Sequence, residues 1–368
     1  MYYLTLFFKF ILPYGLYTYI HSKRNPNYFI NAYNEYLNNG FVEEKQRMIH
    51  LETNYKSIVS VQGLGYSGSG AILDLLCEMN NCEVVGTVKK TKTLGIDHNG
   101  SFEFDFLRLS GGLFEFEKYI DSYNYFQNDA FVNRLISYLN EFSLFKFDRN
   151  VQYLFCDFIN KMTHHQIMGI KGVPYNYHLN PLKKSSDIFF LKHLSIVEYR
   201  ETCKIFLEKL FSYLNINNKS IVILDQLLSD FTFDLNKYND YLPGFKLILS
   251  YRDPRDVYTL ACEHNIGWIS HRNVNSFIDW YKMMTLNINL NTTDYLVVQF
   301  EKLITDYDNQ VRRIMNYLDI SQGEHDDVLK KTYFDPRKSI VNVGLWKSNK
   351  NSEDIELIYN SLKEYCFD

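Results

Sequence analysis

A glycine-rich segment, GLGYSGSGA at 63–71, constrains the fold of this chain more than any other stretch. It follows SIVSVQ, an apolar run typical of a strand, and precedes ILDLLCEM, whose apolar residues recur at helical spacing. A strand, a tight turn and a helix in this order begin a parallel α/β sheet. Such a turn presents backbone N–H groups and the positive end of the helix to an anion. The segment therefore predicts an α/β fold with a phosphate- or sulfate-binding loop.

Two well-known phosphate-binding loops have this glycine pattern, but this chain lacks residues that each of those loops requires. Gly63 and Gly68 have the spacing of a nucleoside-triphosphate loop, but Ser69 and Gly70 stand where that loop needs Lys and then Ser or Thr. With Gly65 the glycines also spell GxGxxG, the dinucleotide fingerprint. That fold needs an acidic residue at the end of its second strand, about 20 residues further on. In EVVGT, the predicted second strand, the acidic residue stands at the beginning.

Later apolar runs predict the rest of the sheet. They are SIVILDQ at 220–226, FKLILSYRDP at 245–254 and DYLVVQFEKL at 294–303. Because the carboxyl ends of parallel strands meet at one edge of a sheet, Asp225, Arg252 and Glu301 are expected beside the glycine loop. Residues 101–217 are expected to be mostly helical and rich in aromatic side chains.

A second motif lies far from the loop, in KLILSYRDPRDVYTLA, a buried strand that ends in Arg252 and leads into a helix. Here the chain resembles the sulfotransferase superfamily, whose strand–RDPRDV–helix element supplies an arginine to the 3′-phosphate of 3′-phosphoadenosine-5′-phosphosulfate (PAPS). The resemblance continues in VVQFEKLITDYDNQVRRIMNYLDI at 297–320 and in NVGLWKSNK at 342–350. It implies a P-loop-like sulfotransferase fold, a central parallel sheet flanked by helices, with PAPS as the sulfuryl donor.

The resemblance also implies which residues bind the donor. The loop residues that would hold the 5′-phosphosulfate are Gly65, Tyr66, Ser67, Gly68, Ser69 and Gly70. Those that would hold the 3′-phosphate are Arg252, Thr259, Lys347 and Ser348. A guanidinium at a strand end suits this role because its planar fork binds a phosphate through two hydrogen bonds. The opposing interpretation is that Arg252 and its neighbour Arg255 are solvated charges paired with nearby aspartates.

Two positions depart from the family pattern. Tyr66 stands where the family loop has Lys or Arg, so another cation must stabilise the leaving phosphate. Leu260 stands where the family has a serine that follows the 3′-phosphate arginine, and Thr259 is the adjacent hydroxyl.

The resemblance places the catalytic base after the second strand, in GSFEFDFLR at 100–108. Glu103 is the first candidate and Asp105 the second, because sulfuryl transfer needs a base for the acceptor hydroxyl. The alternative is a half-buried element whose alternating phenylalanines pack while both carboxylates face solvent. Weaker candidates are His164, His165 and His178. No metal is expected, because no carboxylate and histidine cluster has ligand spacing.

The amino-acid composition limits which classes of partner the protein is expected to bind. A net charge of -4 lacks the basic excess of nucleic-acid-binding proteins. The six cysteines lack paired or disulfide-framework spacing, which favours reduced thiols in the cytoplasm. The 30 Tyr and 28 Phe residues suit sugar-stacking surfaces, although a biased genome also explains them. We expect a saccharide or lipid-linked glycan acceptor. The alternatives are an NAD-dependent Rossmann oxidoreductase and a catalytically silent nucleotide-binding protein.

The N-terminal segment carries an apolar run, LTLFFKFILPYGLYTYI, interrupted by Lys9 and Pro13. It is shorter than the about 20 residues needed to span a bilayer and lacks the flanks of a signal peptide. We expect a helix that packs on the core or gives residues 1–24 a peripheral contact with the inner face of the membrane. Residues 1–50 are accordingly predicted to be a helical appendage, and 51–368 a single sulfotransferase domain.

Overall fold

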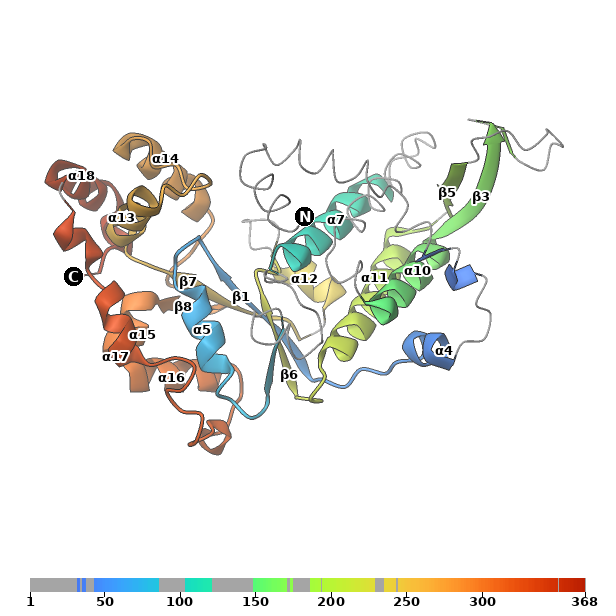
Figure 1. Cartoon of the computed structure of the whole chain (residues 1–368), viewed down its shortest axis with the longest axis horizontal. Coiled ribbons are helices and arrows are strands. Elements are labelled where there is room, and N and C mark those ends of the chain that lie inside the picture. Colours follow the sequence, from blue (N-terminus) through green and yellow to red (C-terminus); the bar gives the residue numbers. More distant parts are fainter. Residues whose placement is uncertain are drawn as a thin grey trace, which may run out of the picture. The chain divides into compact units, whose positions relative to one another are not determined.

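A computed structural model of the chain (Figure 1) describes most of its residues. The described ranges are 32–33, 35–37, 43–85, 103–120, 148–170, 173–174, 186–192, 194–228, 235–242, 244–349 and 351–367. The chain divides into two compact units, Met1–His50 with Phe116–Thr202, and Leu51–Glu115 with Cys203–Asp368. The sequence carries no signal for grouping 116–202 with the N-terminal residues.

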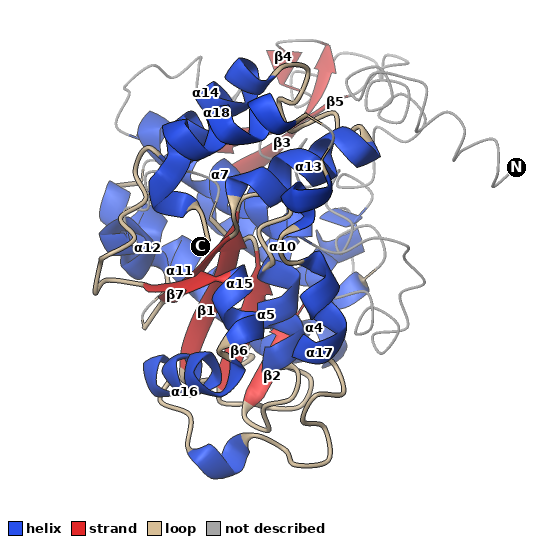
Figure 2. Ribbon diagram, turned by 90° about the vertical axis from the view of Figure 1, so that its left-hand side faces the viewer, coloured by secondary structure: helices blue, strands red, loops and turns tan. Residues whose placement is uncertain are grey.

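The second unit is built on a parallel sheet of five described strands. They are β1 (Ser57–Gly63), β2 (Cys82–Val85), β6 (Ile221–Asp225), β7 (Lys246–Tyr251) and β8 (Leu296–Gln299), in the spatial order β2-β6-β1-β7-β8. Val61 pairs with Asp225 on one side and with Ile248 on the other. The predicted α/β fold class, a central parallel sheet flanked by helices, is confirmed (Figure 2).

The strand order bears on the dinucleotide alternative. In the dinucleotide-binding order 3-2-1-4-5-6 the second strand lies beside the first, and its acidic end reaches the ribose. Here β6 separates β2 from β1. Glu83, the acidic residue of β2, is buried and accepts a hydrogen bond from Nδ2 of Asn217 at 2.8 Å. The described strands therefore lack the ribose-binding arrangement of that fold.

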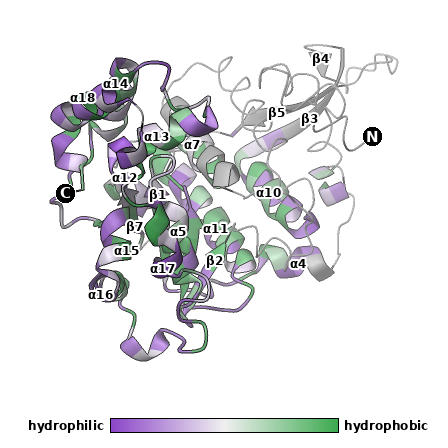
Figure 3. Ribbon diagram, turned by 60° about the vertical axis from the view of Figure 1, so that its left-hand side comes forward, coloured by the Kyte–Doolittle hydropathy of each residue, from purple (hydrophilic) through white to green (hydrophobic). Residues whose placement is uncertain are grey.

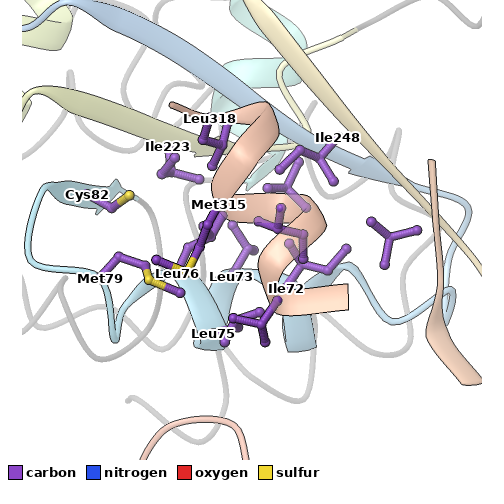
Figure 4. Close-up of a cluster of buried hydrophobic side chains, with 14 of the residues drawn as sticks. Ile72, Leu73, Leu75, Leu76, Met79, Cys82, Ile223, Ile248, Met315 and Leu318 are labelled. Carbon is purple, nitrogen blue, oxygen red and sulfur yellow. The ribbon is translucent and has the colours of Figure 1, made fainter. Parts of the chain in front are cut away.

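One face of the sheet is covered by α5 (Ser69–Leu76), α15 (Phe300–Thr305) and α16 (Tyr307–Tyr317). The apolar stripe of α5, which was predicted from its spacing, is buried against strand residues such as Ile223 and Ile248 (Figure 4). Burial of each large aliphatic side chain stabilises the fold by about 1.5–3 kcal/mol. This packing fixes the start of α5, and with it the glycine loop, relative to the strand ends.

A second apolar cluster joins α13 (Pro254–His264), α14 (Val274–Thr285) and α18 (Ser352–Leu362). Asp253 caps α13 by accepting the backbone N–H of Arg255 at 2.9 Å, and Pro254 occupies the first helical position. Figure 3 shows hydrophilic and hydrophobic residues side by side along α18, as expected for a helix that buries one side.

Two further helices, α7 (Glu103–Ile120) and α11 (Ile196–Leu214), contain residues of both units, because the division falls within them. The short elements are α12 (Leu235–Tyr241), η2 (Gln322–Glu324), α17 (Pro336–Ser339), η3 (Ile340–Asn342), η4 (Leu345–Ser348) and η5 (Lys363–Tyr365). The strand predicted over 294–303 is shorter than expected, because Phe300 already begins α15.

The first unit contains α4 (Glu43–Ile49), α10 (Arg149–Met162), β3 (Thr163–Ile170), β4 (Val173–Pro174) and β5 (Ser186–Leu191). The described part of 101–217 is mostly helical, as expected, through α7, α10 and α11. Strand β3, which pairs antiparallel with both β4 and β5, was not predicted. Each of these strands forms its hydrogen bonds with another segment of the chain. Neither segment alone therefore has a sequence pattern that predicts the pairing. No helix among the described residues has the length and apolarity to cross a membrane, and residues 1–24 lie outside the described ranges.

Candidate functional site

A cleft of about 460 Å³ opens beside the carboxyl ends of β1, β7 and β8. The described residues that line it are Tyr66, Gly68, Ser69, Gly70, Ala71, Asp74, Arg252, Phe300, Tyr333, Phe334, Asp335, Lys338, Ser339 and Asn342. The glycine loop and α5 supply one wall, and the segment 333–342 supplies another. Ligands of open α/β sheets bind in this position, outside the carboxyl ends of the strands.

Two glycines of the loop make room for neighbouring side chains. A Cβ atom at Gly63 would lie 2.0 Å from Oγ of Ser67, and one at Gly68 would lie 2.2 Å from the ring of Phe300. Gly68 also has a φ of 88°, in the left-handed region that favours glycine. The glycine pattern that resembled a dinucleotide fingerprint is thus explained at these positions by packing.

The N-terminus of α5 lies at the cleft, directly after the glycine loop. Gly68, which has no side chain, occupies the N-cap position, and Ser69 and Gly70 line the cleft as the first helical residues. The N–H groups of a first helical turn and the helix dipole attract an anion. Ser67 was predicted to contact the ligand, but its side chain is buried and its backbone N–H donates to the carbonyl of Leu64 at 2.8 Å.

Arg252 links the two walls of the cleft. Its Nη2 donates to the backbone carbonyl of Asn342, and its Nη1 lies 3.5 Å from the carbonyl oxygen of Tyr66. The guanidinium carbon lies 4.8 Å from the ring centre of Phe300, the residue that covers Gly68. Only 5% of the Arg252 side chain is exposed, so this cation is held in place rather than solvated.

Two carboxylates lie beside Arg252. Oδ2 of Asp256 is 3.7 Å from Nη2, and Oε1 of Glu301 is 3.9 Å from Nε. Burial lowers the pKa of Arg252, and these carboxylates oppose that shift. Burial also raises the pKa of Glu301 to about 7, although its Oε1 accepts the backbone N–H of Asp253 at 3.0 Å. Asp225, Arg252 and Glu301 all lie at or just past strand ends, as expected, but of the three only Arg252 belongs to the described lining of the cleft with the glycine loop.

Asp256 connects α13 to the C-terminal GLWK segment. Its carboxylate accepts the backbone N–H groups of Gly344 at 2.9 Å and Trp346 at 3.0 Å. Burial raises the pKa of Asp256, and these hydrogen bonds oppose the shift. Arg255 is buried, pairs with Asp253 at 2.6 Å and lies 4.1 Å above the Trp346 ring. Arg255 is therefore a structural residue and not a solvated charge.

Glu78, two residues past the end of α5, binds the segment that supplies another wall of the cleft. It is fully buried and accepts a hydrogen bond from Nε2 of His325 at 3.0 Å. It also accepts the backbone N–H groups of Lys331 at 3.1 Å and of Tyr333 and Phe334 at 3.0 Å. No local sequence pattern indicates this role, because the donors lie about 250 residues from Glu78.

The cleft gathers part of the predicted site. Tyr66, Gly68, Ser69, Gly70 and Arg252 line it. The hydroxyl of Thr259 is buried, donates to the carbonyl of Arg255 at 2.8 Å and accepts from Asn349 at 3.0 Å. Lys347 and Ser348 lie on η4 and are absent from the described lining, and Oγ of Ser348 donates to the carbonyl of Leu345 at 2.8 Å.

Lys338 is a lining cation that the sequence interpretation missed. It is exposed on α17 and belongs to the described lining of the cleft together with Arg252. The neighbouring Asp335 is paired with Arg337 through bonds of 3.0 and 2.9 Å. The basic pair in DPRKS was the available signal, but no spacing rule connects it to the glycine loop.

The candidate bases are only partly placed. Glu103 and Asp105 lie in the first turn of α7, so this segment is helical, and their side chains lie outside the described residues. His164 and His165 lie on β3 of the other unit, opposite Phe190 and Phe189. His178 lies outside the described residues.

No protein-family model and no curated protein matches the chain. Among solved structures, the chain is similar to sulfotransferase STF9 from Mycobacterium avium, with a TM-score of 0.37 and 12% identity over 89% of this chain and 80% of that one. It is also similar to sulfotransferase STF1 from Mycobacterium tuberculosis H37Rv, with a TM-score of 0.39 and 12% identity over 87% of this chain and 80% of that one. Because these TM-scores are low, it is the strand order β2-β6-β1-β7-β8, and not the similarity to these structures, that defines the fold of this chain.

Proposed function

We propose that this protein is a sulfotransferase that uses PAPS and transfers its sulfuryl group to a hydroxyl of a glycan or glycolipid. The observation that carries the proposal is that the N-terminus of α5 and the guanidinium of Arg252 line one cleft. PAPS carries anionic groups on both its 5′ and its 3′ oxygens, so a protein that binds it needs two separate anion sites. A helix N-terminus and an arginine fork are each suited to one of them.

In this reaction the acceptor oxygen attacks the sulfur atom, and the bond from sulfur to the bridging oxygen of the 5′-phosphate breaks. The acceptor proton passes to a base, for which Glu103 and then Asp105 remain our candidates. The products are a sulfate ester and adenosine 3′,5′-bisphosphate. Tyr66 supplies no positive charge to the leaving phosphate, and we assign that role to Lys338 because it lies in the same cleft.

The first experiment is a calorimetric titration of the full chain with adenosine 3′,5′-bisphosphate, with NAD as the control. We expect saturable binding of the bisphosphate and none of NAD. Binding of NAD alone would overturn the proposal in favour of a dinucleotide enzyme. A second assay then follows transfer of labelled sulfate from PAPS to glycans; bisphosphate binding without any transfer, to saccharides, phenols or steroids, would identify a silent nucleotide-binding protein.

A further inference from the structure

Trp268 lies on the segment that connects α13 to α14, and its ring faces outward. Ile266 and Ile269, two residues before it and one after, are 7% and 1% exposed and belong to the apolar cluster of α13, α14 and α18. Trp268 itself is 60% exposed. Because buried residues hold the backbone on both sides, the exposure of this large apolar ring is a fixed feature of the surface. Exposed aromatic side chains on a rigid base are a common mark of a binding site.

Tyr66 presents a second exposed ring next to it. The ring centres of Tyr66 and Trp268 are 6.1 Å apart and their planes differ by 20°, and Tyr66 is 43% exposed. The backbone of Tyr66 has a φ of 60°, a left-handed conformation that costs a bulky residue free energy and that Gly or Asn adopts more easily. Backbone strain of this kind is found at functional sites.

Gly65 makes the pairing possible. Its backbone conformation is open to any residue, yet a Cβ atom there would lie 1.4 Å from the six-membered ring of Trp268. The glycine is therefore required by the ring and not by the turn. The preceding residue, Leu64, is 5% exposed and packs in the same cluster as Ile266 and Ile269. The two rings thus share one rigid base, and Tyr66 also lines the cleft that contains Arg252.

We propose that Tyr66 and Trp268 form an aromatic platform that binds a sugar ring of the acceptor. This inference rests on the sulfotransferase proposal, since it assigns the acceptor side of the same cleft. A pyranose ring offers a flat C–H face to an aromatic surface while its hydroxyl groups remain at the edges. The platform suits such a ligand because its rings are exposed and nearly parallel, and because Tyr66, one of the two, also lines a polar, charged cleft.

The test measures binding of chitotriose, cellotriose and maltotriose, and separately of adenosine 3′,5′-bisphosphate, to the full chain. We expect at least one trisaccharide to bind, and Trp268→Ala to weaken that binding at least tenfold. Trp268→Phe, which keeps a flat ring, should stay within threefold of the parent protein. Gly65→Ala should weaken saccharide binding as Trp268→Ala does, because its methyl group displaces the ring while leaving the indole in the chain. Trp280→Phe, a change in the half-buried Trp of α14, is the matched control and should have no effect.

The bisphosphate titration separates the two ideas. If the bisphosphate binds while no trisaccharide does, the platform inference is overturned and the sulfotransferase proposal stands. If neither the bisphosphate nor PAPS binds, the sulfotransferase proposal fails, whatever the saccharides do. If Trp268→Ala weakens the bisphosphate more than tenfold and leaves the saccharide unchanged, the rings stack on the adenine base and our assignment is wrong. Tighter binding of a simple phenol than of every trisaccharide would also overturn it.

Discussion

Nε of Arg252 lies 3.9 Å from Oε1 of Glu301, and side-chain exposures of 5% and 1% leave this pair almost without water. Within the described part of the chain, neither Nε of Arg252 nor Oε2 of Glu301 has a hydrogen-bond partner. A buried ion pair with such incomplete hydrogen bonding contributes little net stability, but removal of Arg252 would leave the carboxylates of Asp256 and Glu301 without their cation. The pair therefore makes stability sensitive both to mutation and to pH.

Glu301 should make the free energy of unfolding fall as the pH rises. Burial raises its pKa from 4.5 to about 7, so between these values the folded state binds a proton that the unfolded state has released. The resulting stability is present below pH 4.5 and is lost as the pH rises through 7, by about 3 kcal/mol. Glu301→Gln should flatten this dependence and unfold at a higher urea concentration than the parent protein at pH 8. Parallel stability curves for the two proteins from pH 5 to 8 would contradict the argument.

Arg252→Gln should weaken binding of adenosine 3′,5′-bisphosphate by at least tenfold, because a hydrogen bond to a charged group is worth about 1.5–3 kcal/mol. It should also lower the free energy of unfolding by about 3 kcal/mol, since Asp256 and Glu301 lose their cation. Calorimetry and urea unfolding measure the two effects separately. Arg312→Ala, an exposed change on α16, is the control. Unchanged bisphosphate affinity in Arg252→Gln would remove the second anion site from the proposed mechanism.

Glu78→Ala should destabilise the protein by about 3 kcal/mol or more, because it leaves several buried or half-buried N–H donors without an acceptor. Tyr333 and Phe334 line the cleft, so bisphosphate affinity should fall as well. Urea unfolding followed by circular dichroism gives the first quantity. Glu356→Ala, an exposed change on α18, provides the comparison and should shift stability by less than about 0.5 kcal/mol. Equal stabilities of the two variants would show that Glu78 does not hold this wall.

Two alanine substitutions in the loop should change stability in opposite directions. Gly68→Ala combines a φ of 88° with a collision against Phe300, so we expect a loss of about 2 kcal/mol. Gly70→Ala meets no atom within 4 Å and lies inside α5, where alanine is favoured by up to about 1 kcal/mol. Thermal unfolding of the pair measures the difference. Similar melting temperatures for the two variants would mean that the loop relaxes around Phe300.

The features that the sequence predicts are those encoded by short-range patterns. The strand β1, the helix α5 and the strand β7, which ends just before Arg252, each have a clear apolar pattern in the sequence, and all three lie where expected. The strand order does not follow from these signatures, and it was the order that weakened the dinucleotide alternative. The antiparallel pairing of β3 with β5 was missed because each strand obtains its hydrogen bonds from a segment about 20 residues away.

Residues of the cleft could be predicted from the sequence only where they belong to a motif with a known role. Arg252 and the loop residues Gly68 to Gly70 were found because each belongs to a recognisable motif. Lys338 was missed because a basic pair such as Arg337 and Lys338 carries no sequence signal for where it lies in the fold. Its position depends on the contacts that Glu78 makes with the preceding segment. Thr259 was chosen by adjacency to a family position, but its helix directs the hydroxyl to Arg255 and Asn349.

The fit of Gly65 to Trp268 and of Gly68 to Phe300 limits what can be transplanted from this protein. A designer who grafted residues 63–71 onto another strand and helix would move the glycines but leave both rings behind. The loop would then keep its freedom and lose the surfaces that select one conformation. A portable version of the motif must include the segments around positions 268 and 300, which makes it a three-part module and not a nine-residue one.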